Sequence, residues 1–284
     1  MLRSAVRRVS KRETGESTDF RPSFETRAKG ALFRMRAEPL RPSPAISLEY
    51  AVTNTLPILL VPGLVSSPRI FAPVVPALWR CGPVTLANHI RDDNMGAIAR
   101  RILAEAPTRF ALAGHSMGGY IAFEIIRQAP ERVARLALIN TQARPDTPEA
   151  TARRRSQIAR AQAGEYRAIL DELFPGFVHP SRRDNAELRQ LVHDMGDDIG
   201  AEAFVRQQTA IIGRPDSRPT LAWIKCPTLV LSGDEDDTIP NRLSVEMADG
   251  IHGAKLTILS HCGHLPQVEQ PRATADALVE WMAG

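Results

Sequence analysis

Cysteine is scarce in this chain of 284 residues. Its three cysteines, Cys81, Cys226 and Cys262, lie far apart and form no Cys-x-x-Cys pair. Disulfide-rich domains carry an even number of spaced cysteines, and structural zinc sites use paired ones. The sequence therefore argues against a disulfide framework and against a metal site, and it fits the reducing cytoplasm.

Long apolar runs are also missing. No stretch reaches the roughly 18 apolar residues that cross a bilayer, and residues 1–30 lack the continuous apolar segment of a secretory signal. We therefore expect no membrane span. The start is rich in arginine, as in a transit peptide, but Glu13, Glu16 and Asp19 fit that interpretation poorly.

The chain has no surplus of positive charge outside its first 45 residues. Residues 1–45 contain 11 Lys or Arg and 5 Asp or Glu, whereas the remainder contains 25 and 27. No basic patch interleaved with aromatic residues is present in that remainder, which argues against nucleic-acid binding. We interpret residues 1–45 as a basic, solvated and disordered tail. A tail that binds a membrane surface or a partner is the alternative.

What the chain does have is an alternation of strand and helix patterns on both sides of a helical stretch. The alternation predicts an α/β domain with a mostly parallel sheet, built from residues 46–146 and 221–284. Residues 147–220 form no convincing strand and predict a helical insertion, broken by Pro175 and Pro180. The strands are expected at 47–52, 57–61, 83–87, from 110, 133–140, 227–231 and 255–259. The helices are expected at 71–79, 97–103, 120–128, 151–162, 166–173, 185–195, 201–212, 243–247 and 274–281.

One stretch, residues 110–120, joins an apolar strand to a helix through a serine held between glycines. Gly114-x-Ser116-x-Gly118 has the spacing of a nucleophile elbow, in which small neighbours allow strand and helix to approach closely. The elbow would expose the Ser116 hydroxyl. On this motif alone, a glycine-rich turn with an incidental serine remains the alternative.

A serine hydroxyl needs a base and an oriented acid, which the elbow predicts downstream. His264 follows the expected strand 255–259 and would lie at the sheet edge where the elbow opens; His261 is the nearby alternative. His115 is expected to point away, and His89 has no organised setting. The acid is expected among four carboxylates at 234–237, after strand 227–231, but spacing alone does not select one.

The oxyanion that forms during serine attack needs two hydrogen-bond donors. One is expected to be the backbone N–H of Met117, directly after the serine. The other is expected to be the N–H of Leu64, in the turn that Pro62 and Gly63 make after strand 57–61.

Four motifs together resemble the α/β-hydrolase superfamily, in its esterase-like branch with a helical cap. They are the turn Val61-Pro-Gly-Leu64, the elbow Gly-His-Ser-Met-Gly-Gly119, the acid motif Gly233-x-x-Asp236-x-x-x-Pro240 and the final motif Gly263-His264-Leu265-Pro266 with Glu269-x-Pro271. The resemblance covers about residues 55–282. It implies the α/β-hydrolase fold, with helices on both faces of the sheet, and it implies Asp236 as the acid. Many relatives have His-Gly where this chain has Pro62-Gly63, and the segment before residue 57 is short, which suggests a sheet of about seven strands.

The resemblance also implies a function. Similar proteins are typically hydrolases of esters, thioesters or related bonds that use no cofactor, and their insertion forms a lid, here residues 147–220. We expect a Ser116-Asp236-His264 triad that cleaves a small carboxylic ester or thioester. The serine argues against dehalogenases and epoxide hydrolases of this fold, which attack with an aspartate. Hydrolysis of a carbon–carbon bond, acyl transfer and a non-catalytic binding module remain the alternatives.

Overall fold

The computed structural model describes residues 55–284. The expected strand at 47–52 and the tail of residues 1–45 lie outside the described residues.

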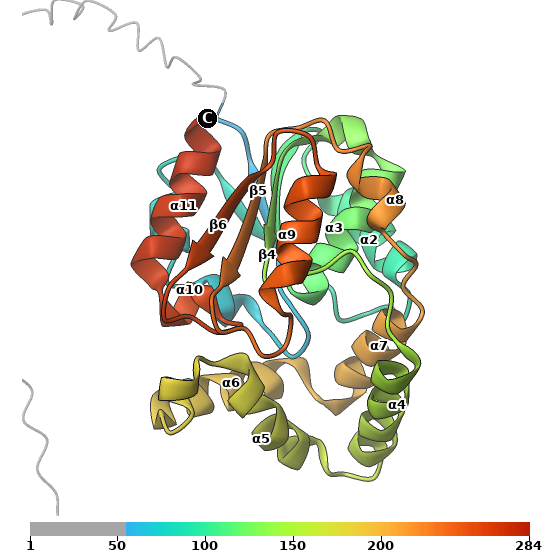
Figure 1. Cartoon of the computed structure of the whole chain (residues 1–284). Helices are drawn as coiled ribbons and strands as arrows, with labels where there is room; N and C mark the ends of the chain where they lie inside the picture. The colour runs from blue at the N-terminus through green and yellow to red at the C-terminus, as the bar shows by residue number, and fades with distance from the viewer. Residues whose placement is uncertain (1–54) are drawn as a thin grey trace, which may run out of the picture. The chain divides into compact units, whose positions relative to one another are not determined.

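Six parallel strands form one sheet within residues 55–284, in the order β2-β1-β3-β4-β5-β6 (Figure 1). The strands are β1 (Ile58–Val61), β2 (Val84–Leu86), β3 (Phe110–His115), β4 (Val133–Ile139), β5 (Thr228–Gly233) and β6 (Lys255–Leu259). Central strands β1, β3 and β5 are buried throughout, because helices cover both faces, and this explains their uninterrupted apolar sequences. The chain runs from β1 outward to β2 and then returns to β3 beside β1. Strand order therefore reverses between β1 and β3, the place where open α/β sheets bind ligands at the carboxyl ends of their strands.

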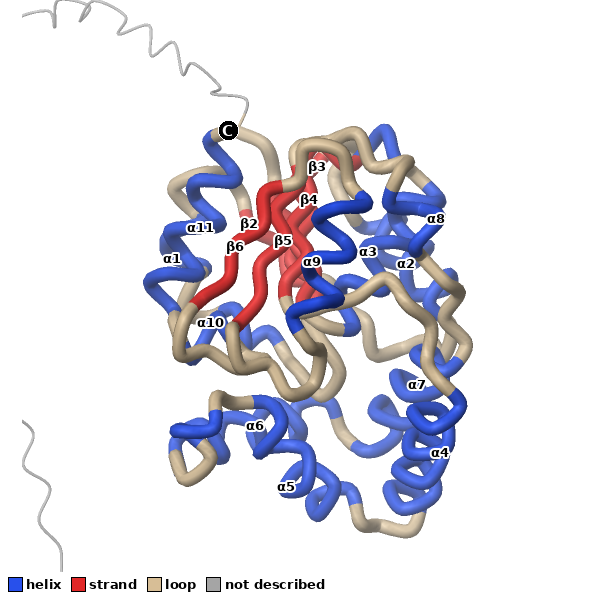
Figure 2. Tube along the Cα trace, in the orientation of Figure 1, coloured by secondary structure: helices blue, strands red, loops and turns tan. Residues whose placement is uncertain are grey.

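Helices pack on both faces of the sheet (Figure 2). One face is covered by α1 (Val75–Leu78), α10 (Pro266–Glu269) and α11 (Pro271–Ala283). The other is covered by α2 (Met95–Glu105), α3 (Met117–Gln128), α8 (Arg218–Leu221) and α9 (Asn241–Gly250). Alternate residues of each strand enter one or the other core, as with Leu59 and Leu60 of β1. This α/β-hydrolase architecture agrees with the fold class expected from the sequence.

Four further helices follow β4 and precede β5, below the carboxyl ends of the strands in Figure 1. They are α4 (Pro148–Gln162), α5 (Tyr166–Phe177), α6 (Ala186–Ile199) and α7 (Ala201–Ile212). The expected break at Pro175 is wrong, because α5 continues through that residue to Phe177. A proline near the end of a helix removes only one backbone donor, and the helix ends two residues later at Phe177. Pro180 instead starts a separate 3-10 turn, Pro180–Arg182.

The helical stretch expected around 71–79 is shorter than predicted. The structure has a 3-10 turn at Pro68–Phe71 and the short helix α1. Pro73 and Pro76 supply no backbone N–H to a helical ladder, so the chain cannot form one continuous helix here.

No helix among residues 55–284 is long and apolar enough to span a membrane.

Candidate active site

Ser116 stands at the sharp turn between β3 and α3, with φ 53° and ψ −116°. Such a backbone is strained for a residue with a side chain, and it is maintained by close packing around the turn. A Cβ on Gly114 would lie 2.4 Å from the Gly118 carbonyl oxygen, and one on Gly118 would lie 2.1 Å from the Val61 carbonyl oxygen. Thr141 Oγ1 also donates a 2.7 Å hydrogen bond to the Ser116 carbonyl. The glycine spacing seen in the sequence therefore has a steric cause.

Ser116, His264 and Asp236 meet at the carboxyl end of the sheet. The Ser116 Oγ lies 2.9 Å from His264 Nε2, and His264 Nδ1 lies 2.8 Å from Asp236 Oδ2. When Nδ1–H donates to the carboxylate, Nε2 is left free to accept from the serine hydroxyl. All three residues are buried, and the side chains of His264 and Asp236 are 3% and 0% exposed. The structure thus brings together three residues that are up to 148 positions apart in the sequence.

Asp236 is surrounded by donors. Its Oδ2 also accepts from Asn140 Nδ2 at 2.8 Å, and its Oδ1 accepts from the backbone N–H groups of Thr238 and Ile239, both at 2.9 Å. Burial opposes ionisation, but the charge of His264 and these hydrogen bonds hold the pKa of Asp236 below its usual value. Sequence analysis missed Asn140, whose only signal was its position directly after β4.

The two backbone donors expected for an oxyanion belong to the residue directly after the serine and to the turn after β1. Met117 is the first residue of α3, and Leu64 lies in the turn after β1. No acceptor is found for either backbone N–H among the described residues. Gly63 allows the turn to approach the elbow, since a Cβ there would lie 3.0 Å from Ser116 Cβ. Both amides are therefore available to a bound oxygen atom.

His115 lies beside the His264 ring, and the expectation that it points away is wrong. The two ring centroids are 5.2 Å apart, and His115 Nε2 donates to the His264 carbonyl at 2.8 Å. Burial, together with the charge of His264, lowers the pKa of His115 to about 3, so the ring is neutral. Its contact with the main chain of His264 supports the position of that residue.

His89 does have an organised setting, contrary to expectation. It lies just past the carboxyl end of β2, with its Nε2 atom 2.9 Å from the Gly63 carbonyl oxygen and 3.0 Å from Gln207 Nε2. Burial lowers its pKa to about 4. Gln207, on α7, also accepts from the Val65 N–H through Oε1 at 3.2 Å. His89 and Gln207 therefore hold the turn that contains Leu64. The position of His89 directly after an expected strand could have indicated its role from the sequence. No sequence feature indicated Gln207.

The loop that carries His264 is held by Glu269. The Oε1 atom of Glu269 accepts from the N–H groups of Gly263 and Leu265, and Oε2 accepts from the N–H of His179. Burial raises the pKa of Glu269 against the opposing effect of these hydrogen bonds. The final sequence motif thus contains a carboxylate that fixes the residues on both sides of His264.

The other candidates at this edge of the sheet do not reach the serine. His261 is exposed, and its backbone N–H donates to Asp234 Oδ2 at 3.0 Å. Asp234 also accepts from the Cys262 N–H, and Asp237 pairs with Arg183. Of these carboxylates, Asp236 is buried beside His264. Asp234 accepts from the loop backbone, and Asp237 forms an ion pair with Arg183.

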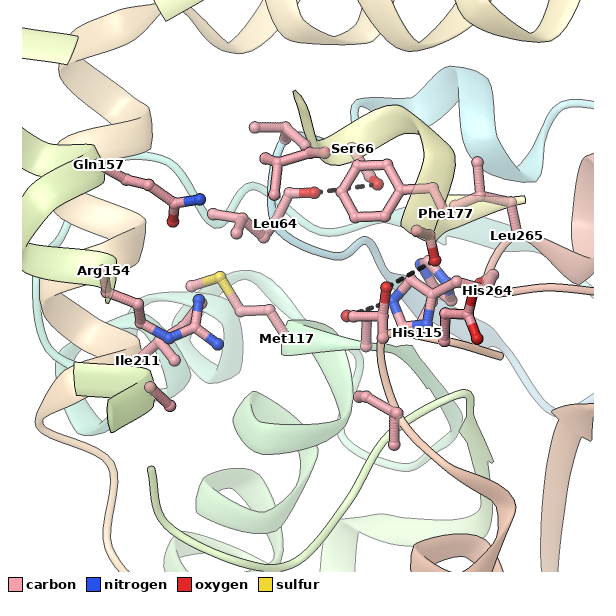
Figure 3. A pocket seen from close by; sticks show the side chains of 18 of the residues that line it. Leu64, Ser66, His115, Met117, Arg154, Gln157, Phe177, Ile211, His264 and Leu265 are labelled. Carbon is pink, nitrogen blue, oxygen red and sulfur yellow. Dashed lines mark hydrogen bonds between the residues drawn. The ribbon is translucent and has the colours of Figure 1, made fainter. Parts of the chain in front are cut away.

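A cavity of about 390 Å³ is lined by Ser116 and by residues of α4 and α5. Figure 3 shows side chains that line it. Phe177 lines it and stacks on His264 with 5.8 Å between ring centroids. Phe174 and Phe204 are instead buried in the apolar core. No group of three His, Cys, Asp or Glu side chains able to hold a metal occurs between residues 55 and 284.

Residues 58–277 match the alpha/beta hydrolase family, and the chain belongs to this family. It is 28% identical over 245 residues to a protein of Variovorax paradoxus with the provisional name carbamate hydrolase, covering 80% of this chain and 91% of that one. It is 27% identical to a 2-hydroxymuconate semialdehyde hydrolase of Pseudomonas sp. strain CF600, covering 79% and 80%. An esterase structure from Thermogutta terrifontis matches with a TM-score of 0.73 at 29% identity, covering 80% and 89%. The protein is therefore a hydrolase of the α/β-hydrolase family.

Proposed function

We propose that the protein is a serine hydrolase that cleaves a small carboxylic ester or thioester. The observation that carries this proposal is the continuous pair of contacts from Ser116 Oγ to His264 Nε2 and from His264 Nδ1 to Asp236 Oδ2. An activated serine of this kind attacks carbonyl carbon and forms an acyl-enzyme.

The two half-reactions use the same groups. His264 takes the proton of Ser116 as the oxygen attacks the carbonyl carbon, and then gives it to the leaving alcohol or thiol. Water deprotonated by His264 next attacks the acyl-enzyme and releases the acid. In both steps the Leu64 and Met117 amides donate to the negative oxygen.

Asp236 acts through His264. Its carboxylate keeps the proton on Nδ1, so that Nε2 faces the serine, and it stabilises the imidazolium that forms in each half-reaction. The four hydrogen bonds that Asp236 accepts favour the charged carboxylate that this role requires.

The proposed domain division follows from this site. Residues 46–146 and 221–284 make the catalytic core, and residues 147–220 act as a lid, because α4 and α5 supply residues to the cavity wall. The 1–45 segment is proposed as an accessory tail in a cytoplasmic enzyme.

Carbon–carbon bond hydrolysis is the second candidate. It is favoured by the similarity to the Pseudomonas 2-hydroxymuconate semialdehyde hydrolase over 79% of this chain. Such a substrate would also place a carbonyl against Ser116. Acyl transfer differs only in the acceptor that replaces water.

Replacement of Ser116 tests the proposal. Ser116→Ala is expected to lower turnover of short p-nitrophenyl esters by on the order of 10⁶-fold and to prevent labelling by a fluorophosphonate. Ser260→Ala, which changes an exposed serine away from the cavity, is the matched control and should keep both activities. Undiminished turnover in Ser116→Ala would contradict the mechanism, and wild-type protein that is neither active nor labelled would support a binding module.

A further inference from the structure

The wall of the cavity contains charged side chains besides the groups around Ser116. Five charged side chains other than histidine line the cavity, namely Asp146, Arg153, Arg154, Glu172 and Asp237. In Figure 3, Arg154 and Gln157 lie at one end and His264 at the other, with Leu64 and Met117 between them.

Two of the three carboxylates pair with arginines that do not line the cavity. Glu172 pairs with Arg160 at 2.7 Å, and Asp237 pairs with Arg183. Arg160 also pairs with Glu165 at 2.8 Å, so these three side chains keep one negative charge, on carboxylates that are more than half exposed to solvent. The pair of Asp237 and Arg183 is neutral.

The third carboxylate is shared by two arginines. Asp146 Oδ2 accepts from Arg154 Nε at 2.7 Å, and Oδ1 accepts from Arg214 Nη1 at 2.6 Å. The side chains of Asp146 and Arg214 are 4% and 3% exposed, and the buried Nη2 of Arg214 has no partner among the described residues. The trio of Asp146, Arg154 and Arg214 therefore has one net positive charge.

Arg154 is the member of this trio that lines the cavity. Its Nη1 donates to Gln208 Oε1 at 2.7 Å, while Nη2 has no acceptor in residues 55–284. Two bonds on Nε and Nη1 fix the guanidinium, and Figure 3 shows it directed toward Met117. Arg153 adds a second positive charge at the exposed rim, and it forms no ion pair within the described part of the chain.

The position of the Arg154 guanidinium relative to Ser116 and His264 indicates which part of a substrate would contact it. His264 must protonate the leaving group, so the leaving group lies on the His264 side of the serine. In Figure 3, Arg154 lies at the opposite end of the cavity from His264, with Met117 between them. The acyl chain of a substrate whose leaving group faces His264 would therefore extend toward Arg154.

We propose that Arg154, assisted by Arg153, binds a carboxylate at the far end of the acyl chain. This inference rests on the proposed function and gives it a substrate class: monoesters or monothioesters of dicarboxylic acids. A fixed guanidinium with a free edge is suited to carboxylate recognition, and the partly buried setting strengthens the hydrogen bonds.

A graded ester series measures the preference. Monoethyl esters of dicarboxylic acids of increasing length are compared with the matching esters that end in a carboxamide, by the release of ethanol. Wild-type protein is expected to favour the carboxylate member in kcat/KM by tenfold or more at the best length, since hydrogen bonds to charged groups exceed neutral ones. Equal rates, or a preference for the carboxamide, would overturn the inference.

Variants connect the preference to the arginines. Arg154→Gln should reduce the ratio of kcat/KM for the two esters to near one, Arg153→Gln should reduce it less, and Arg154→Lys should keep part of it. Arg155→Gln is the charge-matched control on the same helix, outside the cavity wall, and should leave the ratio unchanged. An undiminished ratio in Arg154→Gln protein that unfolds at the wild-type temperature would refute the role of Arg154.

A binding measurement separates this inference from the proposed function. In calorimetric titrations, Ser116→Ala protein should bind the preferred carboxylate ester at least tenfold more tightly than its carboxamide, and Ser116→Ala/Arg154→Gln should not. If the protein binds the carboxylate ester preferentially but shows no hydrolysis that depends on Ser116, only the proposed serine-hydrolase reaction is refuted. Hydrolysis of neutral esters without preferential binding would refute only the carboxylate site.

Discussion

At the scale of single residues, the site depends on main-chain groups as much as on side chains. Ser116, Asn140 and Val65 all have positive φ although none is glycine. Each stands directly after a parallel strand or in the turn that follows one, where the chain changes direction sharply. Neighbouring hydrogen bonds offset the strain, such as that from Thr141 Oγ1 to the Ser116 carbonyl.

Asp236 gives a prediction about both rate and stability. Asp236→Asn is expected to lower kcat by ~10⁴-fold, because the amide no longer stabilises the imidazolium or fixes its tautomer. The pKa of Asp236 in the folded protein lies below its unfolded value of 3.8, so its charge stabilises the fold above that value and the effect is lost as the pH falls through the folded pKa.

Urea unfolding of wild type and Asp236→Asn at a series of pH values measures the stability part. The free-energy difference between the two proteins should be largest near neutral pH and shrink below about pH 4. A difference that stays constant across this range would show that Asp236 is not the titrating group.

Gln207 gives a second prediction, because it is the acceptor for the N–H of Val65, next to Leu64. Gln207→Ala leaves that buried donor unpaired and frees the oxyanion turn, so kcat should fall by about tenfold with a smaller change in KM. Gln207→Glu keeps the acceptor and should restore most of kcat.

Ester kinetics and thermal unfolding together test this role. Gln162→Ala, at the exposed end of α4, is the control and should change neither quantity. A loss of stability in Gln207→Ala with kcat intact would indicate that Gln207 only packs the lid helix.

At the scale of elements, the elbow works because β1, β3 and α3 approach closely. The main chain of α3 at Gly118 passes so near to β1 that a methyl group would lie 2.1 Å from the Val61 carbonyl oxygen and 2.8 Å from that of Pro62. Any side chain there must push α3 away from the turn that holds Leu64. The proposed oxyanion donors and the proposed nucleophile thus share one packing constraint.

Gly118→Ala is therefore expected to destabilise the protein by about 3 kcal/mol and to lower kcat as well, since backbone atoms cannot rotate out of the contact. Gly213→Ala is the matched control, because a methyl group there meets its nearest atom at 3.7 Å. Denaturant unfolding and ester kinetics measure both variants. Wild-type stability in Gly118→Ala would contradict the close approach.

The end of α5, in the proposed lid, is joined to the His264 loop by specific contacts. The His264 N–H donates to the Phe177 carbonyl at 2.9 Å, and Glu269 binds the N–H groups of His179 and Gly263. A Cβ on Gly263 would lie 2.4 Å from the His179 nitrogen. The end of α5 therefore fixes the main chain of the proposed base, so movement of this part of the lid would also move His264.

At the scale of the whole molecule, the six described strands and the site lie within residues 55–284, and the family match begins at residue 58. The surplus of positive charge is in residues 1–45. Protein that lacks residues 1–45 should keep kcat and KM for short esters within about twofold, because its site is complete. Steady-state kinetics of the shortened and full-length proteins test this, and loss of activity would show that the segment contributes to the enzyme.

Much of this arrangement was predictable from the sequence. Apolar runs marked the central strands β1, β3 and β5, since strands buried on both faces need uninterrupted hydrophobic sequence. The order of serine, acid and histidine placed Ser116 and His264 after strands whose carboxyl ends share one edge of the sheet. The choice of Asp236 among four carboxylates required the family resemblance.

Only the tertiary structure decided which distant groups support the site. Asn140, His89, Gln207 and the ring of His115 act through contacts between segments far apart in the chain, and no local pattern encodes such contacts. The tertiary structure also decided the charge of the cavity wall. That charge depends on which arginines pair with Asp146, Glu172 and Asp237. Local sequence determined the strands and turns through backbone sterics and hydrophobic burial, whereas the electrostatics of the cavity emerged from packing of the lid against the core.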